Sequence, residues 1–335
     1  MTSEIRGTIG TARTRALLEI LADGEPHSGE DIGSRLGVSR AAVWKLVDQA
    51  RRAGLDIRAL PGAGYRLPAP LTLLDAGRIS EALGTDVHHY RRLEVRLATG
   101  STNQDLLQDS APLDHPVALL AEHQSAGRGR RGRHWLSPMG ASLYLSVAWP
   151  LGVPVAGLSG LSLVAGLAVA EAVDQICDLQ VGLKWPNDLY VGRRKIGGIL
   201  VEVSGSPEGP CKAVIGSGLN CRFPEGVEDT DIDQPWTDLY RASGIAVDRN
   251  QLAAAILAQY ARDLPVFERD GFTPFVERWN RRDILLDQPV ILQLGQESAT
   301  GIARGVSELG ALVLEENGRR RSIAGGDVSL RPDRP

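Results

Sequence analysis

Residues 127–133 read Gly-Arg-Gly-Arg-Arg-Gly-Arg, a run with three glycines and four arginines. Glycine allows backbone torsions and close approaches to a ligand that other residues avoid. Each arginine carries a rigid fork of N–H donors that suits phosphate or carboxylate oxygens. Because the positive charges repel one another in an empty loop, we expect this arginine loop (residues 127–133) to become ordered when an anion binds.

A run of this composition can also be a solvated tail that touches RNA. Here it lies in the middle of the chain, between two apolar stretches, residues 117–121 and 142–149, that both read as β-strands. A loop held between two core strands is more often a binding site than a tail. We therefore expect the arginine loop to be part of a site for an anionic ligand.

The length of 335 residues suggests about two or three domains, and 43% hydrophobic with 23% charged residues is typical of a globular protein. The longest apolar run, residues 158–176, is interrupted by glycines and two acidic residues, so we expect a buried helix and no membrane span. The three cysteines and six histidines show no ligand spacing. We therefore predict a cytoplasmic protein with reduced thiols and no metal site of its own.

The first 68 residues predict a winged helix-turn-helix. Residues 13–22 form an amphipathic helix, Ser28 is a good cap for a second helix, and Ser39 is a good cap for a third after a break at Gly37. Two strand-like pieces around a Pro-Gly-Ala turn then predict a wing. A helix, a tight glycine turn and a helix with a basic outer face are typical of DNA-binding domains.

This unit has a local excess of positive charge, although the whole chain has a net charge of −4. Residues 38–66 carry six basic residues against Asp48 and Asp56. A small helical cap with an ordinary charged surface would look similar. We predict that five residues contact DNA, on a two-fold site bound by a dimer: Arg40, Trp44, Lys45, Arg58 and Arg66.

Residues 72–282 alternate between helix and strand patterns and predict a mixed or mostly antiparallel sheet with helices on it. Helices are expected at residues 71–83, 101–108, 158–176 and 249–267, and strands at residues 94–98, 117–121, 142–149, 181–184, 189–191, 199–203 and 211–217. Neither GxGxxG after a strand nor GxxxxGK[ST] occurs, so a bound nucleotide would use neither common phosphate loop. Residues 285–335 predict a small barrel of short strands, with turn signals at Gly310 and at Asn317-Gly318. The strands are expected at residues 289–294, 301–306, 311–315, 320–324 and 328–330.

Three further motifs fall at ends of predicted strands. Residues 184–188 read Lys-Trp-Pro-Asn-Asp, residues 195–200 read Lys-Ile-Gly-Gly-Ile-Leu, and residues 216–220 read Gly-Ser-Gly-Leu-Asn. Each alone is a weak signal, because a lysine before a strand is usually exposed and Gly-x-Gly is usually a turn. Together with the arginine loop they indicate a site for a polar, anionic ligand.

These four motifs, in this order, resemble the biotin–protein ligases, and the predicted winged helix resembles their bifunctional members, which are also biotin operon repressors. The resemblance covers nearly the whole chain. It implies an α+β multidomain fold: a winged helix-turn-helix, a mixed sheet with helices like that of class II aminoacyl-tRNA synthetases, and a small SH3-like β-barrel. The expected boundaries are 1–68, 72–282 and 285–335.

The resemblance also implies an activity. Such enzymes join biotin to ATP, release pyrophosphate, hold biotinoyl-5′-AMP and pass the biotinoyl group to a lysine of biotin carboxyl carrier protein. Mg²⁺ would arrive with ATP, held mostly by phosphates and water. In bifunctional members the adenylate promotes a homodimer that binds operator DNA. Since two anions must meet, catalysis rests on positioning and electrostatic stabilisation, with no nucleophilic side chain.

Site residues follow from the matched motifs. We expect Lys195, Arg130 and Asp188 to be catalytic, with Asp188 linked to Mg²⁺ or orienting the lysine. The residues expected to bind biotin are Ser101, Thr102, Asn103, Gln124, Arg128, Gly129, Arg130 and Lys195. Those expected on the nucleotide side are Arg130, Arg133, Trp135, Asn187, Asn220 and Trp236. Ser101–Asn103 could instead be only a helix cap, and Trp236 only a core tryptophan.

Three alternatives stay open. The chain could be a biotin-sensing transcription factor without ligase activity, although Lys195, Arg130 and Asn187 are intact. It could be a ligase whose winged helix does not regulate transcription. A lipoate or octanoate ligase would share the general fold, but the arginine loop favours biotin.

Overall fold

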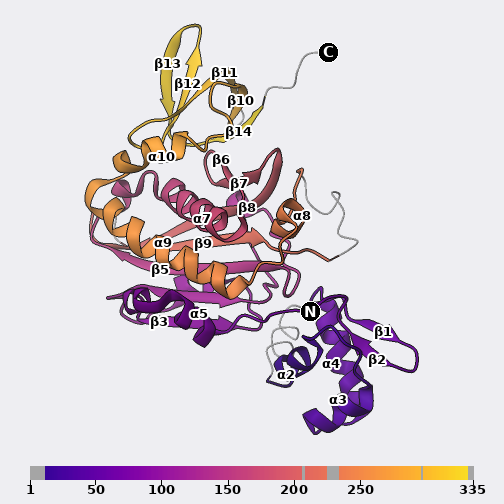
Figure 1. Cartoon of the computed structure of the whole chain (residues 1–335). Helices are drawn as coiled ribbons and strands as arrows, with labels where there is room; N and C mark the ends of the chain where they lie inside the picture. Colours follow the sequence, from indigo (N-terminus) through magenta and orange to yellow (C-terminus); the bar gives the residue numbers. More distant parts are fainter. Residues whose placement is uncertain (1–11, 206–207, 225–233, 296, 331–335) are drawn as a thin grey trace, which may run out of the picture.

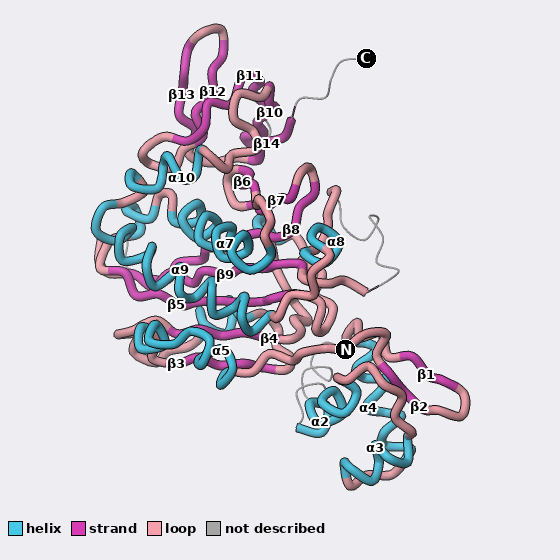
Figure 2. Tube along the Cα trace, in the orientation of Figure 1, coloured by secondary structure: helices cyan, strands magenta, loops and turns pink. Residues whose placement is uncertain are grey.

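The computed structural model describes residues 12–205, 208–224, 234–295 and 297–330. A small helical unit lies at one end, a sheet covered by helices forms the middle, and a small β-unit lies at the other end (Figure 1). The tube in Figure 2 shows the same division, with strands of the middle unit running side by side and α7 and α9 lying over them.

The described part of the N-terminal unit, from residue 12, holds three helices and a two-stranded wing. These elements are α2 (Ala12–Leu21), α3 (Gly29–Leu36), α4 (Arg40–Arg52), β1 (Arg58–Leu60) and β2 (Gly64–Arg66). The hydroxyl groups of Ser28 and Ser39 accept hydrogen bonds from the first turns of α3 and α4, as predicted. The winged helix-turn-helix is therefore present.

The turn between α3 and α4 depends on glycine at two positions. Gly37 has a φ of 63°, the left-handed conformation that ends α3. A Cβ on Gly33 would lie 2.8 Å from the carbonyl oxygen of Val38, so the two helices can approach only without a side chain there. On the inward face of α4, Val43, Val47 and Ala50 are buried.

The middle unit is a seven-stranded sheet with the order β3-β4-β5-β9-β8-β7-β6. Its strands are β3 (Arg92–Arg96), β4 (Val117–Ala121), β5 (Ser142–Leu151), β6 (Gly182–Lys184), β7 (Asp188–Val191), β8 (Arg194–Gly205) and β9 (Cys211–Asn220). Only β3 and β4 run parallel, and every other pair is antiparallel. The predicted mixed sheet is confirmed.

The helices of the middle unit cover both faces of this sheet. They are α5 (Ala76–Leu83), α6 (Thr102–Gln108), α7 (Leu161–Cys177), α8 (Leu239–Ser243), α9 (Arg249–Asp270) and α10 (Val276–Asn280), with 3-10 turns η1 (Gly84–His89), η2 (Arg130–Gly132), η3 (Val155–Leu158) and η5 (Thr273–Phe275). Along β4, Ala118 and Leu120 join the large core that holds α7 and α9. Val117 and Leu119 join a smaller cluster under α6. The alternation places α6 on the face opposite α7 and α9.

The apolar segment Val155–Cys177 has the length and mean hydropathy, 1.7, of a membrane-crossing helix. More than half of its most apolar window, 56%, is buried inside the protein, and α7 packs against α9 (Figure 1). A core helix meets the same length criterion, so the predicted buried helix is confirmed.

The helix predicted over residues 71–83 is wrong in its first part, because α5 begins only after its cap, Asp75. The residues before Asp75 form hydrogen bonds with distant parts of the chain instead. The N–H of Leu71 donates to the carbonyl of Ala22, and the N–H of Leu74 donates to the buried carboxylate of Glu122. These tertiary partners hold the segment between the two units out of helical conformation.

The C-terminal unit is a five-stranded antiparallel sheet with the order β13-β12-β11-β10-β14. Its strands are β10 (Pro289–Leu294), β11 (Glu297–Val306), β12 (Leu312–Glu316), β13 (Arg319–Ile323) and β14 (Asp327–Leu330). All five overlap the predicted strands, and Asn317 and Gly318, both with positive φ, form the predicted turn between β12 and β13.

The winged helix-turn-helix touches the middle unit at the end of α4. The N–H of Met139 donates to the carbonyl of Ala53 at 3.0 Å. A Cβ on Gly54 would lie 3.1 Å from Pro138, so the chains pass very close together. The side chain of Met139 is buried in the same hydrophobic cluster as Val47. Residues just beyond the arginine loop therefore support the DNA-binding unit.

Candidate functional site

A cavity of about 610 Å³ opens where strands of the central sheet meet the arginine loop and β14. All fourteen residues that the sequence predicts for biotin, nucleotide or catalysis line this cavity. They are Ser101, Thr102, Asn103, Gln124, Arg128, Gly129, Arg130, Arg133, Trp135, Asn187, Asp188, Lys195, Asn220 and Trp236. The fold thus brings together motifs that are far apart in the sequence.

One end of the cavity is a network of neutral hydrogen-bonding groups. Ser101 caps α6, and the N–H and hydroxyl of Thr102 both contact the side-chain oxygen of Gln124, at 2.8 and 3.1 Å. The hydroxyls of Thr102 and Ser146 are 2.6 Å apart, and Ser146 donates to the side-chain oxygen of Asn103 at 2.6 Å. Ser101–Asn103 are buried and belong both to a helix cap and to the cavity wall. This end fits a compact polar head without charge.

An ion pair lies at the centre of the cavity wall. The ammonium group of Lys195 is 2.6 Å from a carboxylate oxygen of Asp188, with side-chain exposures of only 13% and 17%. The two residues come from adjacent strands, because β7 pairs with the start of β8. Gly198 lies across from Asp188, and a Cβ there would be 3.4 Å from the Asp188 carboxylate. The paired glycines therefore leave room for the ion pair and for a ligand beside it.

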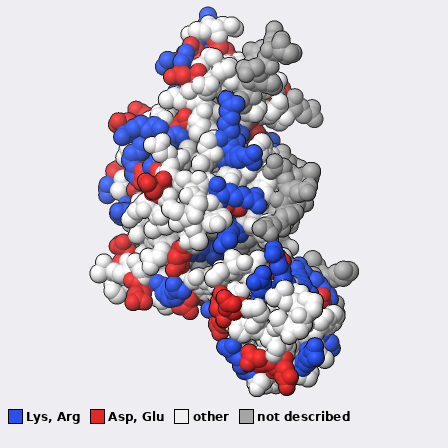
Figure 3. Space-filling view, turned by 45° about the vertical axis from the view of Figure 1, so that its right-hand side comes forward, with Lys and Arg blue, Asp and Glu red and all other residues white. Residues whose placement is uncertain are grey.

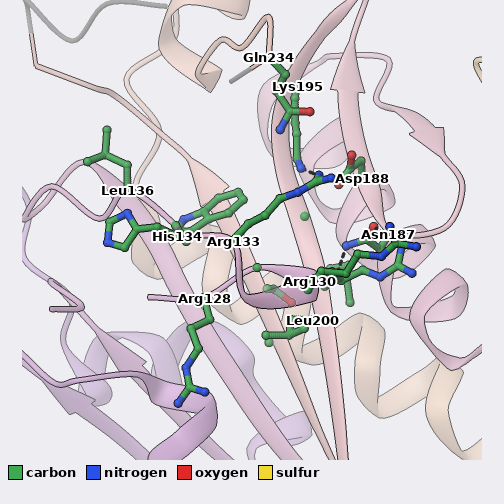
Figure 4. A pocket seen from close by; sticks show the side chains of 18 of the residues that line it. Arg128, Arg130, Arg133, His134, Leu136, Asn187, Asp188, Lys195, Leu200 and Gln234 are labelled. Atoms are coloured by element: carbon green, nitrogen blue, oxygen red, sulfur yellow. Dashed lines mark hydrogen bonds and ion pairs between the residues drawn. The ribbon is translucent and has the colours of Figure 1, made fainter. Parts of the chain in front are cut away.

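The arginine loop lines the cavity, and its side chains Arg128, Arg130 and Arg133 extend in different directions (Figure 4). The loop contacts three separate elements. Arg128 donates to the side-chain oxygen of Gln104 on α6 and points away from Arg130. Arg130 donates to the side-chain oxygen of Asn187 at 3.3 Å, and Asn187 in turn donates to the carbonyl of Ile199. The loop is therefore held from both sides of the cavity.

The third contact comes from the C-terminal unit. The carboxylate of Asp327 lies 2.8 Å from the guanidinium of Arg131, 3.4 Å from Arg133 and 3.8 Å from Arg130. One carboxylate thus faces three arginines. Burial lowers the pKa of Arg130 and also that of Lys184, which lines the same region. The excess of cations makes this part of the cavity suitable for phosphates.

The other end of the cavity is aromatic. The ring of Trp236 is buried, packs against Phe223 with centroids 4.8 Å apart, and carries the guanidinium of Arg241 over it. Trp135 packs so closely on Gly218 that a Cβ there would lie 2.9 Å from the indole. The indole N–H groups of Trp135 and Trp236 have no hydrogen-bond partner among the described residues. A flat heteroaromatic ring with acceptor atoms fits this end.

Several lining residues escaped the sequence analysis. Ser146 lies in a strand interior, where serine carries no functional signal. Gly216 belongs to the 216–220 motif, but the sequence gives it no role of its own. Lys184 is the first residue of the 184–188 motif, but the sequence does not indicate a role for it. Asp327 lies in β14, in a separate unit, and no local pattern links it to the arginine loop. Only the packing of the C-terminal unit over the cavity reveals its position.

The residues predicted to contact DNA lie on α4 and on the wing. Trp44 is 56% exposed, and Arg40 and Lys45 are exposed without ion-pair partners among the described residues. Arg58 and Arg66 face each other across the β1–β2 pair, and Arg58 also pairs with Asp56. The space-filling view shows basic and acidic side chains side by side on this unit (Figure 3). The free positive charge is therefore concentrated at the start of α4.

The chain matches three known sequence families along its length. Residues 13–66 match a helix-turn-helix domain, residues 97–220 match the biotin/lipoate A/B protein ligase family, and residues 285–331 match the biotin protein ligase C-terminal domain. The bifunctional ligase/repressor BirA of Salmonella typhimurium is 44% identical over 94% of this chain and 96% of its own length.

This chain belongs to the bifunctional biotin ligase/repressor family. The Escherichia coli BirA is 42% identical over the same shares of both chains. The biotin–[acetyl-CoA-carboxylase] ligase of Mycobacterium tuberculosis is 36% identical over 71% of this chain and 89% of its own. Among solved structures, the biotin protein ligase of Aquifex aeolicus in complex with biotin and ATP matches with a TM-score of 0.60 and 31% identity. The match covers 72% of this chain and 98% of that one.

Membership of the biotin ligase/repressor family agrees with the geometry of the cavity. A group of neutral hydrogen-bonding side chains, a central lysine, a cationic loop and two buried tryptophan rings all line it. These parts suit the polar head, the acyl phosphate and the purine of an acyl adenylate. Within the described residues, no group of three or more His, Cys, Asp and Glu side chains could hold a metal ion.

Proposed function

We propose that the chain is an ATP-dependent ligase that adenylates biotin and transfers it to a lysine of biotin carboxyl carrier protein, and that it also represses transcription when the adenylate is bound. The observation that carries the ligase proposal is the Lys195–Asp188 pair, 2.6 Å apart, between the neutral end and the cationic loop. A carboxylate and an α-phosphate that meet there would both face the lysine.

In the first step, a carboxylate oxygen of biotin attacks the α-phosphorus of ATP, the bond to the β-phosphate oxygen breaks, and pyrophosphate leaves. Negative charge builds on the transferring phosphoryl group, and fixed cations stabilise it. Lys195 is the cation at the centre of the site, and Arg130 is the cation that the arginine loop brings to it. Asp188 orients Lys195, and Ser101, Thr102, Asn103 and Gln124 bind the ureido head together with Arg128 and Gly129.

In the second step, the amine of the acceptor lysine attacks the acyl carbon, AMP leaves, and the amine loses its proton. Arg133, Trp135, Asn187, Asn220 and Trp236 would hold the nucleotide during both steps. Exclusion of water by the arginine loop protects the mixed anhydride from hydrolysis.

Mg²⁺ fits this site as a companion of ATP. The two carboxylates that line the cavity, Asp188 and Asp327, are already held by Lys195 and by arginines. The described lining of the cavity therefore offers no cage of carboxylates, and phosphate oxygens and water would supply most ligands. Bound to ATP, the ion would neutralise charge on the phosphates.

Repression would use the winged helix-turn-helix on operator DNA. A single small domain makes few phosphate contacts, so a dimer on a two-fold site is expected. We place the dimer contact, and the competing contact with the carrier protein, at the open edge of β8. β7 covers β8 only as far as Gly198, and no strand pairs with that edge beyond this point in the described part of the chain.

We further propose domain boundaries at residues 1–68, 72–282 and 285–335, a cytoplasmic location and no membrane partner. Three alternatives predict different results. A biotin sensor without ligase activity would bind biotin but label no carrier protein. A ligase without regulation would label the carrier protein but show no operator shift that strengthens with biotin plus ATP. A lipoate or octanoate ligase would prefer those acids.

Carrier labelling with biotin and ATP tests the ligase proposal, and a gel-shift titration on a two-fold operator tests repression. Labelling that needs both small molecules and a salt-dependent shift that strengthens with them would support both activities. A shift unaffected by biotin and ATP would contradict repression controlled by the adenylate.

A further inference from the structure

The amide group of Asn103 is held by a residue outside the cavity. Asn103 is 5% exposed, and its side-chain nitrogen donates to a carboxylate oxygen of Glu202 at 2.9 Å and to the carbonyl of Leu200 at 3.2 Å. Both partners belong to β8. Leu200 lines the cavity, whereas Glu202, one pleat further along the same face, does not.

These two contacts fix which way the amide points. Because carboxylate and carbonyl oxygens can only accept, the nitrogen of Asn103 must face β8 and its oxygen must face the opposite way. That oxygen accepts from the hydroxyl of Ser146 at 2.6 Å, which leaves one lone pair for another donor. A Cβ on Gly216 would lie 2.3 Å from the same oxygen, so this position must be glycine for the oxygen to lie there.

The orientation matters for the kind of acid that the neutral end accepts. An amide oxygen at the cavity wall accepts from an N–H group, which a ureido ring has and an apolar ring lacks. If the amide of Asn103 turned over, its NH₂ group would face the N–H of the ureido ring. Two donors would then oppose each other, and the buried ureido N–H would have no acceptor. The hydrogen bond from Asn103 to Glu202 therefore makes this part of the cavity wall a hydrogen-bond acceptor.

We propose that Glu202 is a positioning residue that fixes the amide of Asn103 as an acceptor and thereby sets the affinity of the site for a head group bearing N–H. Glu202 acts through Asn103 and does not itself touch the substrate. The inference rests on the proposed function, since it assumes that the neutral end binds the head of biotin.

The contact also ties the biotin end of the cavity to the open edge of β8. Glu202 lies beyond Gly198, in the part of β8 that pairs only with β9 among the described residues. Asn103 lies in the first turn of α6. The hydrogen bonds of Asn103 to Glu202 and Leu200 thus link α6 to the strand at which we place pairing with a second copy or with the carrier protein.

The test uses the full-length protein and compares Glu202→Ala with Glu202→Gln, whose amide oxygen can still accept. The control is Ser204→Ala, at an exposed position two residues further along β8. Calorimetry measures the Kd for biotin, and pyrophosphate exchange measures kcat and the KM for ATP. Thermal unfolding midpoints report whether each variant is folded.

Glu202→Ala should raise the Kd for biotin about tenfold, the value expected for a lost charge-assisted hydrogen bond. The KM for ATP and kcat at saturating biotin should stay within about twofold of wild type, Glu202→Gln should recover most of the affinity, and the control should change nothing. In an Asn103→Ala background, Glu202→Ala should have no further effect on the Kd, because the two residues act as one unit.

An unchanged Kd in Glu202→Ala would overturn the proposal. So would an equal effect of Glu202→Ala in the presence and absence of Asn103, since the carboxylate would then act independently. A common loss of biotin affinity, ATP affinity and thermal stability would show only a structural role and would also overturn it. Wild type that binds biotin but shows no exchange would contradict the ligase function while the Kd comparison still decides the role of Glu202. Wild type that does not bind biotin would overturn both.

Discussion

The carboxylate of Asp327 lies 2.8 Å from the guanidinium of Arg131, so the last described strand of the chain contacts the loop that covers the cavity. Arg130 and Arg133 lie within 3.8 and 3.4 Å of the same carboxylate. Without a bound anion, Asp327 is the counter-ion that lets three arginines lie together. ATP would bring phosphates to the same cations.

Replacing Asp327 by Asn should therefore loosen the arginine loop when no ligand is bound. We expect trypsin to cut the loop at least several-fold faster in Asp327→Asn than in wild type, because opening frees arginine bonds to the protease. Biotin plus ATP should restore protection. Asp287→Asn is the matched control, since Asp287 pairs with Arg304 within the C-terminal unit. Equal cleavage rates in all three proteins would contradict the counter-ion role.

Arg130→Gly should release the adenylate. Arg130 is half-buried and donates to Asn187, so its loss removes both a cation and a closing contact. We expect adenylate to leave roughly ten- to a hundredfold faster, from the loss of one or two charge-assisted hydrogen bonds, and bystander lysines to become labelled. Retention after gel filtration and labelling of serum albumin measure the two effects. Arg193→Gly, at an exposed turn off the cavity wall, is the control. Adenylate retained as well as in wild type would mean that Arg130 is not part of the lid.

Lys45→Ala should weaken operator binding and lower its dependence on salt. Lys45 is exposed on α4 and has no ion-pair partner among the described residues, so a DNA phosphate is a natural partner for its charge. Each lost phosphate contact reduces the slope of log K against log salt by about one per protomer. Arg52→Ala is the control, because Arg52 pairs with Asp48 on the same helix. Biotin adenylation should be unchanged in both variants, and an unaltered slope for Lys45→Ala would remove this residue from the DNA interface.

Asp283 should make stability depend on pH. Burial raises the pKa of this carboxyl to about 7, and one of its oxygens has no hydrogen-bond partner. The folded state therefore prefers the protonated acid. The contribution of the protonated Asp283 to the free energy of unfolding is fully present below the pKa of the unfolded chain, near 4. It is lost as pH rises through 7, by up to about 1.4 kcal/mol per pH unit.

Asp283→Asn should remove this part of the pH dependence, because the amide stays neutral. Urea unfolding at pH 4 to 8 should give a difference between variant and wild type that grows in favour of the variant toward pH 8. A constant difference across that range would show that Asp283 does not carry a raised pKa in the folded protein.

The sequence predicted best those features that depend on local chemistry. Ser28, Ser39 and Ser101 each cap a helix, as short hydroxyl side chains before an amphipathic run indicate. The cavity residues were predicted through the resemblance to the biotin–protein ligases, which the arginine loop and the three strand-end motifs carry in combination. Strand patterns in β10–β14 were clear because turns with Gly310 and Asn317 separate them.

The features that could not be predicted depend on contacts between distant parts of the chain. The segment before Asp75 reads as helix in the sequence but is not helical, because Leu74 donates to the buried Glu122. Asp327 joins the cavity only through packing of the C-terminal unit. Glu202 lies in an ordinary strand pattern, and only the position of Asn103 reveals its partner.

The most direct test of the whole account is pyrophosphate exchange into ATP, measured with biotin, with lipoate or with no acid. We predict exchange that requires biotin, is lost in Lys195→Ala, and falls sharply in Asp188→Asn, because the lysine then loses the carboxylate that orients it. Exchange that lipoate supports equally, or that persists in Lys195→Ala, would contradict the proposed site. No exchange in a protein that still binds biotin would identify a sensor and not a ligase.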